Sequence, residues 1–108
     1  MISYLMSILS LHYGQDRAIS ADCLFRDLRA AGYDVPGLPA LRGLIHDARQ
    51  QGRLIGSCDK GYFLPVSLDE ALHYIEHRFL TPARDELRTA RLQRRKALES
   101  FGPQMRLL

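Results

Sequence analysis

Pro39-Ala-Leu-Arg-Gly-Leu-Ile-His-Asp-Ala-Arg-Gln-Gln-Gly52, together with the residues that follow it, is the stretch that decides the fold. Its apolar residues recur at the three- and four-residue spacing of a helix: Leu41, Leu44, Ile45 and Ala48. They share one face, as a helix packed on a small core requires. Pro39 suits the first helical turn, and Gly52 suits a helix end. We predict a helix over residues 38–51.

Two short strand-like segments come directly after this helix, Arg53–Ser57 and Tyr62–Pro65. Their apolar residues include the β-branched Ile55 and the aromatic Tyr62 and Phe63, and the gap between them contains Asp59 and Gly61, which favour a turn. We therefore expect a hairpin over residues 53–65 with Lys60 at its tip. A polar-faced helix that leads into a hairpin is the arrangement of recognition helix and wing in a winged helix-turn-helix. The predicted fold is mainly α with a small β-hairpin, a winged helix-turn-helix with a C-terminal helical extension.

Length and composition limit the class of protein. The chain has 108 residues, of which 46% are hydrophobic and 25% are charged, and this composition excludes a disordered chain. We expect one domain over residues 1–80, followed by a basic C-terminal helix and tail over residues 81–108. The formal net charge of +3 and the pI near 9.1 permit an acidic partner without requiring one.

Two further helices precede the central one. Residues 2–13 form an apolar run whose face is wider than one packing surface needs, so we expect the C-terminal helix, a second subunit or both to cover it. Ala18-Ile19 is a candidate third strand for the hairpin. Ser20 is a favourable N-cap for a helix over residues 21–31. A turn from Gly32 to Leu38 then leads to the central helix.

The C-terminal part begins with a capping box, Ser67-Leu-Asp-Glu70. We expect the helix that it opens to bury Leu68, Ala71, Leu72, Ile75 and Phe79. Thr81-Pro82 indicates a kink or a new helix start. The next helix, over residues 83–101, is rich in arginine and has a heptad seam that Arg94 interrupts. Gly102-Pro103 is expected to end it.

The run Gly52–Ala71 resembles phage and prophage winged-helix proteins. The most specific part of the resemblance is Lys60-Gly-Tyr-Phe-Leu64 followed by Ser67-Leu-Asp-Glu70. The resemblance covers roughly residues 18–78 and implies DNA binding. The long turn from Gly32 to Leu38 and the apolar first helix depart from the usual pattern.

One polar stripe on the predicted helix and hairpin is the candidate DNA contact. Arg and Gln side chains read guanine and adenine edges in the major groove, and Lys and Arg contact phosphate. The alternative is a solvated helix face, and Asp47 beside the stripe argues against a phosphate partner. Arginines of the C-terminal helix are expected either to contact phosphate or to form the outer face of a dimerisation helix. The candidate DNA-binding residues are Arg42, His46, Arg49, Gln50, Arg53, Lys60, Arg88, Arg91 and Arg95.

We expect a homodimer, because a small domain with a surplus apolar face gains buried area by association. Its predicted interface residues are Leu5, Leu9, Leu87 and Phe101. The main functional hypothesis is a cytoplasmic, sequence-specific double-stranded DNA-binding protein that regulates phage or bacterial transcription or replication. The alternative hypothesis is a winged-helix protein-interaction module, such as a phage-encoded inhibitor of a host defence complex.

Other functional classes have less support. Cys23 and Cys58 lack metal-site spacing, so we interpret both as reduced thiols, with Cys23 in the core. His73 and His77 share a helix face with Glu70, but no nearby Cys or Asp completes a set of four ligands, so we expect no metal. No cofactor motif, catalytic constellation or membrane span is recognisable, and we expect no enzyme activity.

Overall fold

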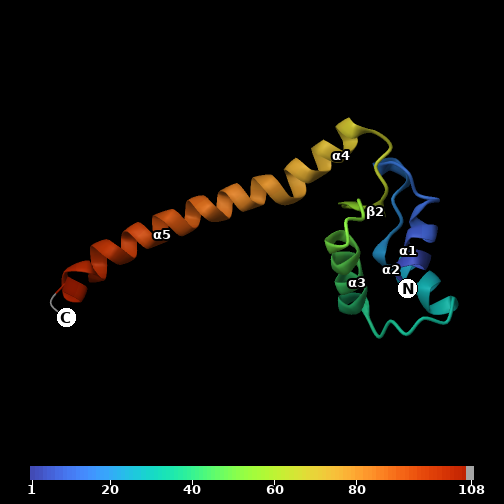
Figure 1. Ribbon diagram of the computed structural model, residues 1–108, viewed down its shortest axis with the longest axis horizontal. Coiled ribbons are helices and arrows are strands. Elements are labelled where there is room, and N and C mark those ends of the chain that lie inside the picture. The colour runs from blue at the N-terminus through green and yellow to red at the C-terminus, as the bar shows by residue number, and fades with distance from the viewer. Residues whose placement is uncertain (107–108) are drawn as a thin grey trace. The chain divides into compact units, whose positions relative to one another are not determined.

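The computed structural model describes residues 1–106 and places the chain in two compact units, Met1–Tyr74 and Ile75–Leu108 (Figure 1). We call them the N-terminal and C-terminal units. The expected boundary lay later, after residue 80. The elements in order are α1 (Ile2–Leu9), the 3-10 turn η1 (Gln15–Arg17), α2 (Ala21–Ala30), α3 (Leu38–Gln50), β1 (Gly56–Cys58), β2 (Gly61–Phe63), α4 (Leu68–Ile75), the π-helical turn η2 (Glu76–Leu80) and α5 (Thr81–Arg106). The prediction of a mainly α fold with a small β-hairpin is confirmed.

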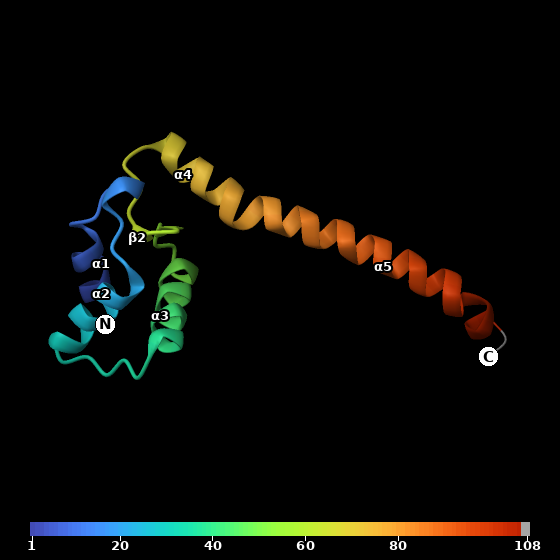
Figure 2. The same ribbon diagram turned by 180° about the vertical axis from the view of Figure 1, so that it is seen from behind.

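The core of the N-terminal unit lies where α1, α2 and α3 meet the segments around the hairpin (Figure 2). Each helix contributes residues at helical spacing, and the loop between α2 and α3 contributes Val35, which is almost fully buried. This long connection is therefore anchored in the core. The core side chains are Leu5, Leu9, Ile19, Leu24, Leu28, Val35, Leu41, Ile45, Ala48, Ile55 and Leu64.

Helix α1 is shorter than expected and packs inside its own unit. It ends at Leu9 because the backbone then turns to pair with the segment after β2: Leu64 N–H donates to His12 O (2.9 Å), and Gly14 N–H donates to Leu64 O (2.8 Å). Leu5 and Leu9 are 0% exposed within this core. Their assignment to a subunit interface is therefore wrong. Ile2, Met6 and Ile8 are partly buried against the same core, whereas Leu11, beyond the end of α1, is exposed.

The hairpin is bound to the connection between α1 and α2. Strands β1 and β2 are antiparallel, with Gly56 opposite Phe63 and Cys58 opposite Gly61. Ile19 adds an antiparallel bridge to Tyr62, with each backbone N–H donating to the other's carbonyl at 2.8 Å. Ala18-Ile19 was expected to form a third strand, but the sheet has two strands, and only Ile19 pairs with it, through this single bridge.

Two glycines allow close approaches in the hairpin. A Cβ on Gly61, whose φ is +135°, would lie 1.9 Å from the carbonyl oxygen of Ile19. A Cβ on Gly56 would lie 2.5 Å from the ring of Phe63. Neither gap accepts a methyl group, so both glycines are required for the hairpin to close as it does.

Helix α4 packs on the hairpin through fewer residues than expected. Ala71 and Tyr74 are buried, and the Tyr74 ring meets Phe63 edge-on at a centroid distance of 6.2 Å. Leu68, Leu72 and Phe79 are exposed, so their predicted burial is wrong. The capping box forms in part: Ser67 Oγ accepts from Glu70 N–H (3.2 Å). The Glu70 carboxylate accepts from Val66 N–H (3.1 Å) and Gln15 N–H (3.3 Å).

Three local expectations need correction. Cys23 is exposed and not in the core, because it lies in the first turn of α2, where its backbone N–H donates to the cap Ser20 Oγ. Helix α5 does not stop at Gly102-Pro103 but continues to Arg106, and residues 107 and 108 of the expected tail lie outside the described residues. Thr81 does not cap a new helix, because its φ of −63° and ψ of −50° are helical and the helical backbone runs on from α4 through η2 into α5.

We predict that Gly61→Ala destabilises the protein by about 3 kcal/mol or more, because the methyl group overlaps the Ile19 backbone. Gly52→Ala is the matched control. Gly52 also has a left-handed φ of +88°, but nothing lies within 4 Å of the added Cβ. It should cost only about 1–2 kcal/mol. Chemical denaturation of both variants measures the difference, and equal losses would contradict the role of the close approach.

Candidate nucleic-acid interface

Helix α3 presents a polar row to solvent. Its opposite face is held in the core by Leu41, Ile45 and Ala48. That packing leaves the side chains of Arg42, His46 and Gln50 exposed at spacings of four residues, on one side of the helix. All three were predicted to contact DNA, and the structure places them together on one exposed face of the helix.

Arg49 has a different position. It is half-buried, its Nε donates to Ile55 O at 3.0 Å, and its guanidinium carbon lies 5.6 Å from the centre of the Tyr74 ring. This one side chain therefore ties α3 to the residue before β1 and to α4. Since its guanidinium is held within the unit, we remove Arg49 from the residues expected to read bases. Sequence spacing put it beside Arg42 and His46 but gave no sign of these tertiary contacts.

The hairpin supplies two further predicted contacts. Arg53 follows the end of α3, where its backbone N–H donates to Ala48 O (3.0 Å), and its side chain is exposed. Lys60 is exposed in the two-residue turn between β1 and β2. Both remain candidates for phosphate contacts, because their charged groups are exposed and lie outside the core.

The two units carry opposite charge balances. The N-terminal unit has seven Lys and Arg residues against eight Asp and Glu, whereas the C-terminal unit has eight against four. The whole positive excess of the chain thus lies in the C-terminal unit. Arg88, Arg91 and Arg95 are exposed on α5, and Arg88 approaches Asp85 at 3.8 Å. Long-range attraction of a polyanion would therefore come from α5 and not from α3.

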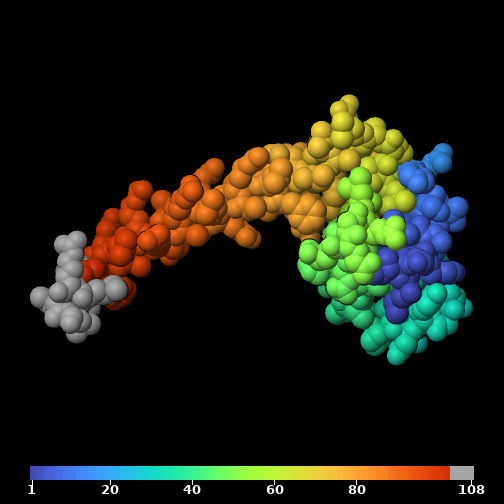
Figure 3. All heavy atoms as spheres, in the orientation of Figure 1, coloured from blue at the N-terminus to red at the C-terminus, as the bar shows by residue number. Residues whose placement is uncertain are grey.

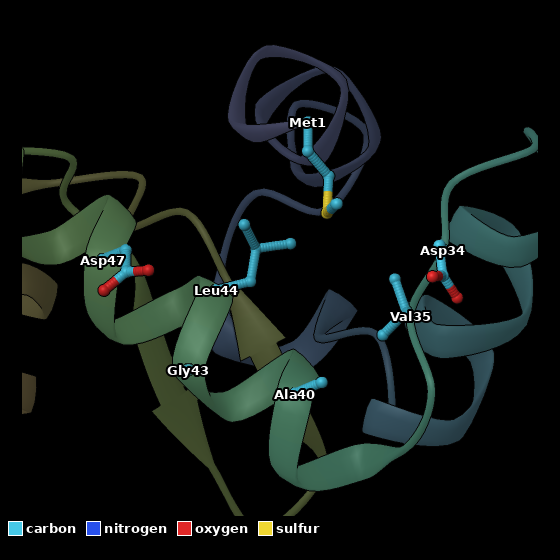
Figure 4. A pocket seen from close by; sticks show the side chains of 7 residues that line it. All are labelled: Met1, Asp34, Val35, Ala40, Gly43, Leu44 and Asp47. Carbon is cyan, nitrogen blue, oxygen red and sulfur yellow. The ribbon is translucent and has the colours of Figure 1, made fainter.

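An acidic hollow of about 280 Å³ flanks α3 (Figure 4). Asp34 and Asp47 lie at its opposite edges, and Met1, Val35 and Leu44 supply apolar lining. The two carboxylates come from positions thirteen residues apart, so the sequence gave no signal that they share a site. Carboxylates accept hydrogen bonds and attract cations, which makes this hollow suited to a basic group and unsuited to phosphate.

The predicted absence of a metal site rested on His73 and His77. Both oxygens of the nearby Glu70 accept backbone N–H groups, which commits that carboxylate to holding η1 and the start of α4. Among residues 1–106, no three His, Cys, Asp or Glu side chains gather as ligands of one ion.

Comparison with protein-family models, with curated proteins and with solved structures gave no significant match. The resemblance to phage winged-helix proteins thus rests on the quoted sequence motifs alone. No helix in the described part of the chain has both the length and the apolar character needed to cross a membrane.

We predict that Arg49→Ala lowers the free energy of unfolding by about 2 kcal/mol. It removes a charge-assisted hydrogen bond to Ile55 O and the contact with Tyr74. Arg42→Ala, on the same helix but exposed, is the control and should change stability by less than about 0.5 kcal/mol. Urea denaturation followed by circular dichroism tests both. Equal stability of the two variants would return Arg49 to the set of free surface residues.

Proposed function

We propose that the N-terminal unit is a winged helix-turn-helix module that binds double-stranded DNA. In this proposal α3 enters the major groove and the turn between β1 and β2 lies on neighbouring backbone. The observation that carries it is the order of elements: two helices, the exposed α3, then a hairpin that takes Ile19 as a third-strand bridge. In a winged helix with this order of elements, the third helix is the recognition helix that contacts DNA.

The proposal assigns different work to different side chains. Arg42 and Gln50 have the donors and acceptors that read base edges, and His46 lies between them on the same face. Arg53 and Lys60 would contact phosphate, which positions the module without reading sequence. Arg88 and Arg95 on α5 would add further sequence-independent affinity. The module would act in the cytoplasm as a phage or bacterial regulator of transcription or replication.

A second candidate function is recognition of a protein, with a host defence complex as one possible target. The acidic hollow at Asp34 and Asp47 favours it, because the two carboxylates would attract a Lys or Arg side chain of a partner. The acidic balance of the N-terminal unit supports the same candidate. Asp47 therefore separates the two functions, since it opposes phosphate and attracts a basic partner.

We predict that Arg42→Ala weakens binding to a cognate duplex by about 1–3 kcal/mol and relaxes specificity at one base pair. The matched control is Arg17→Ala, which removes the same charge from an exposed position on η1 and not on α3. Binding isotherms on genomic fragments from around the gene provide the measurement. If the two substitutions weakened binding equally, the loss of one positive charge would explain both results, and base reading by α3 would be contradicted.

We predict that Lys60→Ala weakens binding to all duplexes and lowers the slope of log affinity against log salt by about one. Asp47→Asn should strengthen DNA binding several-fold, because it removes a negative charge beside the α3 row. A salt titration of each variant tests both expectations. If the unmodified protein binds no duplex even at low salt, the DNA proposal fails. In that case, loss of a basic partner on Asp47→Asn would support the second candidate.

A further inference from the structure

Helix α5 carries an apolar seam that this chain leaves uncovered. Residues 80, 83, 87, 90, 94, 97 and 101 alternate spacings of three and four. Leu80 is the last residue of η2, and the other six form one stripe along α5. Leu80, Leu87 and Phe101 are 43%, 50% and 57% exposed, and all residues from 81 to 101 are exposed. Their side chains lie in the orange to red part of Figure 3.

The composition of the seam is regular. Using heptad letters, the a positions are Leu80, Leu87, Arg94 and Phe101, and each d position between them is alanine: Ala83, Ala90 and Ala97. Large a residues supply apolar area, while alanines at d allow two backbones to approach closely. Residues 81–101 of this helix are all exposed, and a helix of 26 residues, ~39 Å long, gains most of its stability only when such a face is covered.

We propose that this seam pairs with a second copy of the chain as a parallel, in-register, two-stranded coiled coil. Three heptads lie between Leu80 and Phe101, which is the shortest run that indicates a coiled coil. Self-association through α5 goes beyond the DNA-binding proposal and does not depend on it. It replaces the interface that the sequence had placed partly on α1, and it retains Leu87 and Phe101.

Charge complementarity selects both the partner and the orientation. In a parallel pair, a residue at g faces the residue at e five positions later on the other helix. Glu86 at g then meets Arg91 of the partner subunit, and by symmetry this contact forms twice. In an antiparallel pair, e positions face one another, which brings Arg84 and Arg91 against arginines of the other copy. Attraction in one arrangement and repulsion in the other favour the parallel coil.

Arg94 sets the register at a cost in affinity. In the parallel coil its a position faces the same position of the other copy, and a single basic residue at a fixes register while weakening the pair. The long aliphatic stem of arginine lets the charged end reach the edge of the seam. We therefore expect a concentration-dependent dimer with a dissociation constant of roughly 1–100 µM.

The coil divides the arginines of α5 into two groups. Arg91 lies at e and contacts the other subunit, whereas Arg88 and Arg95 lie at b and point away from the seam. Residues at b stay available for phosphate while the coil is formed. Self-association and polyanion binding thus use different side chains of one helix, and they can be tested separately.

The first experiment is a charge exchange on the full chain, read by sedimentation equilibrium without DNA. Glu86→Arg and Arg91→Glu should each raise the dimer dissociation constant by about tenfold, because two attractive contacts become repulsive. Both substitutions together should restore it to within about threefold. Glu99→Arg is the matched control: it makes the same charge change as Glu86→Arg, but at the outward f position, and should have little effect.

The second experiment tests orientation in a chain with Cys23→Ser and Cys58→Ser. Arg94→Cys should give a disulfide-linked dimer on mild oxidation, because equivalent a positions meet in a parallel, in-register coil. Arg95→Cys, one residue along at b, should not. An antiparallel coil would place position 94 beside Ala83 of the partner subunit and keep the thiols apart.

A third variant, Arg94→Leu, should strengthen the dimer by at least about tenfold by completing the apolar seam. Three results would overturn the proposal. They are a monomer for the unmodified chain up to about 100 µM, a dimer dissociation constant that the Glu86 and Arg91 substitutions leave unchanged, or no selective cross-link at position 94. Since none of these measurements involves DNA, failure here is distinct from failure of the DNA-binding proposal.

Discussion

The contact between Ile19 and Tyr62 is the constraint on which the N-terminal unit depends. Two backbone hydrogen bonds of 2.8 Å join the connection before α2 to β2, and they require the backbones to meet where Gly61 has no side chain. This closure holds the hairpin on the three-helix core and sets where the chain leaves α3. The polar row of α3 is exposed because Leu41, Ile45 and Ala48, on the other face of the helix, are buried in this core.

Arginine serves opposite purposes in this small protein. Arg49 is drawn inward by Ile55 O and the Tyr74 ring and joins three elements of a core that has few residues to spare. Arg42, seven residues earlier on the same helix, remains exposed to solvent. The sites therefore differ in tertiary environment and not in residue type or helical phase. A guanidinium suits both because its apolar plane packs on aromatic rings while its edge donates hydrogen bonds.

The division of charge gives the two units complementary tasks in the proposed function. In that proposal the nearly balanced, slightly acidic N-terminal unit would discriminate by shape and by a few polar contacts, and Asp47 would limit indiscriminate binding to phosphate. The positive excess on α5 supplies attraction that is long-ranged and sensitive to salt. If α5 also pairs with a second copy, the dimer would present two N-terminal units to DNA together, and avidity would raise its overall affinity.

The sequence by itself determined the type and order of the elements from α2 to α4, because capping residues, glycine stops and apolar periodicity act over a few neighbouring residues. Ser20, Gly52 and the Asp59–Gly61 turn are examples. Only the tertiary structure decided which of these surfaces are buried and which stay exposed to solvent. Leu5 and Leu9 are core residues, Cys23 and Leu72 are exposed, and Asp34 joins Asp47 beside α3. Local patterns show that a face is apolar or charged. Which element packs against that face depends on contacts between residues far apart in the chain.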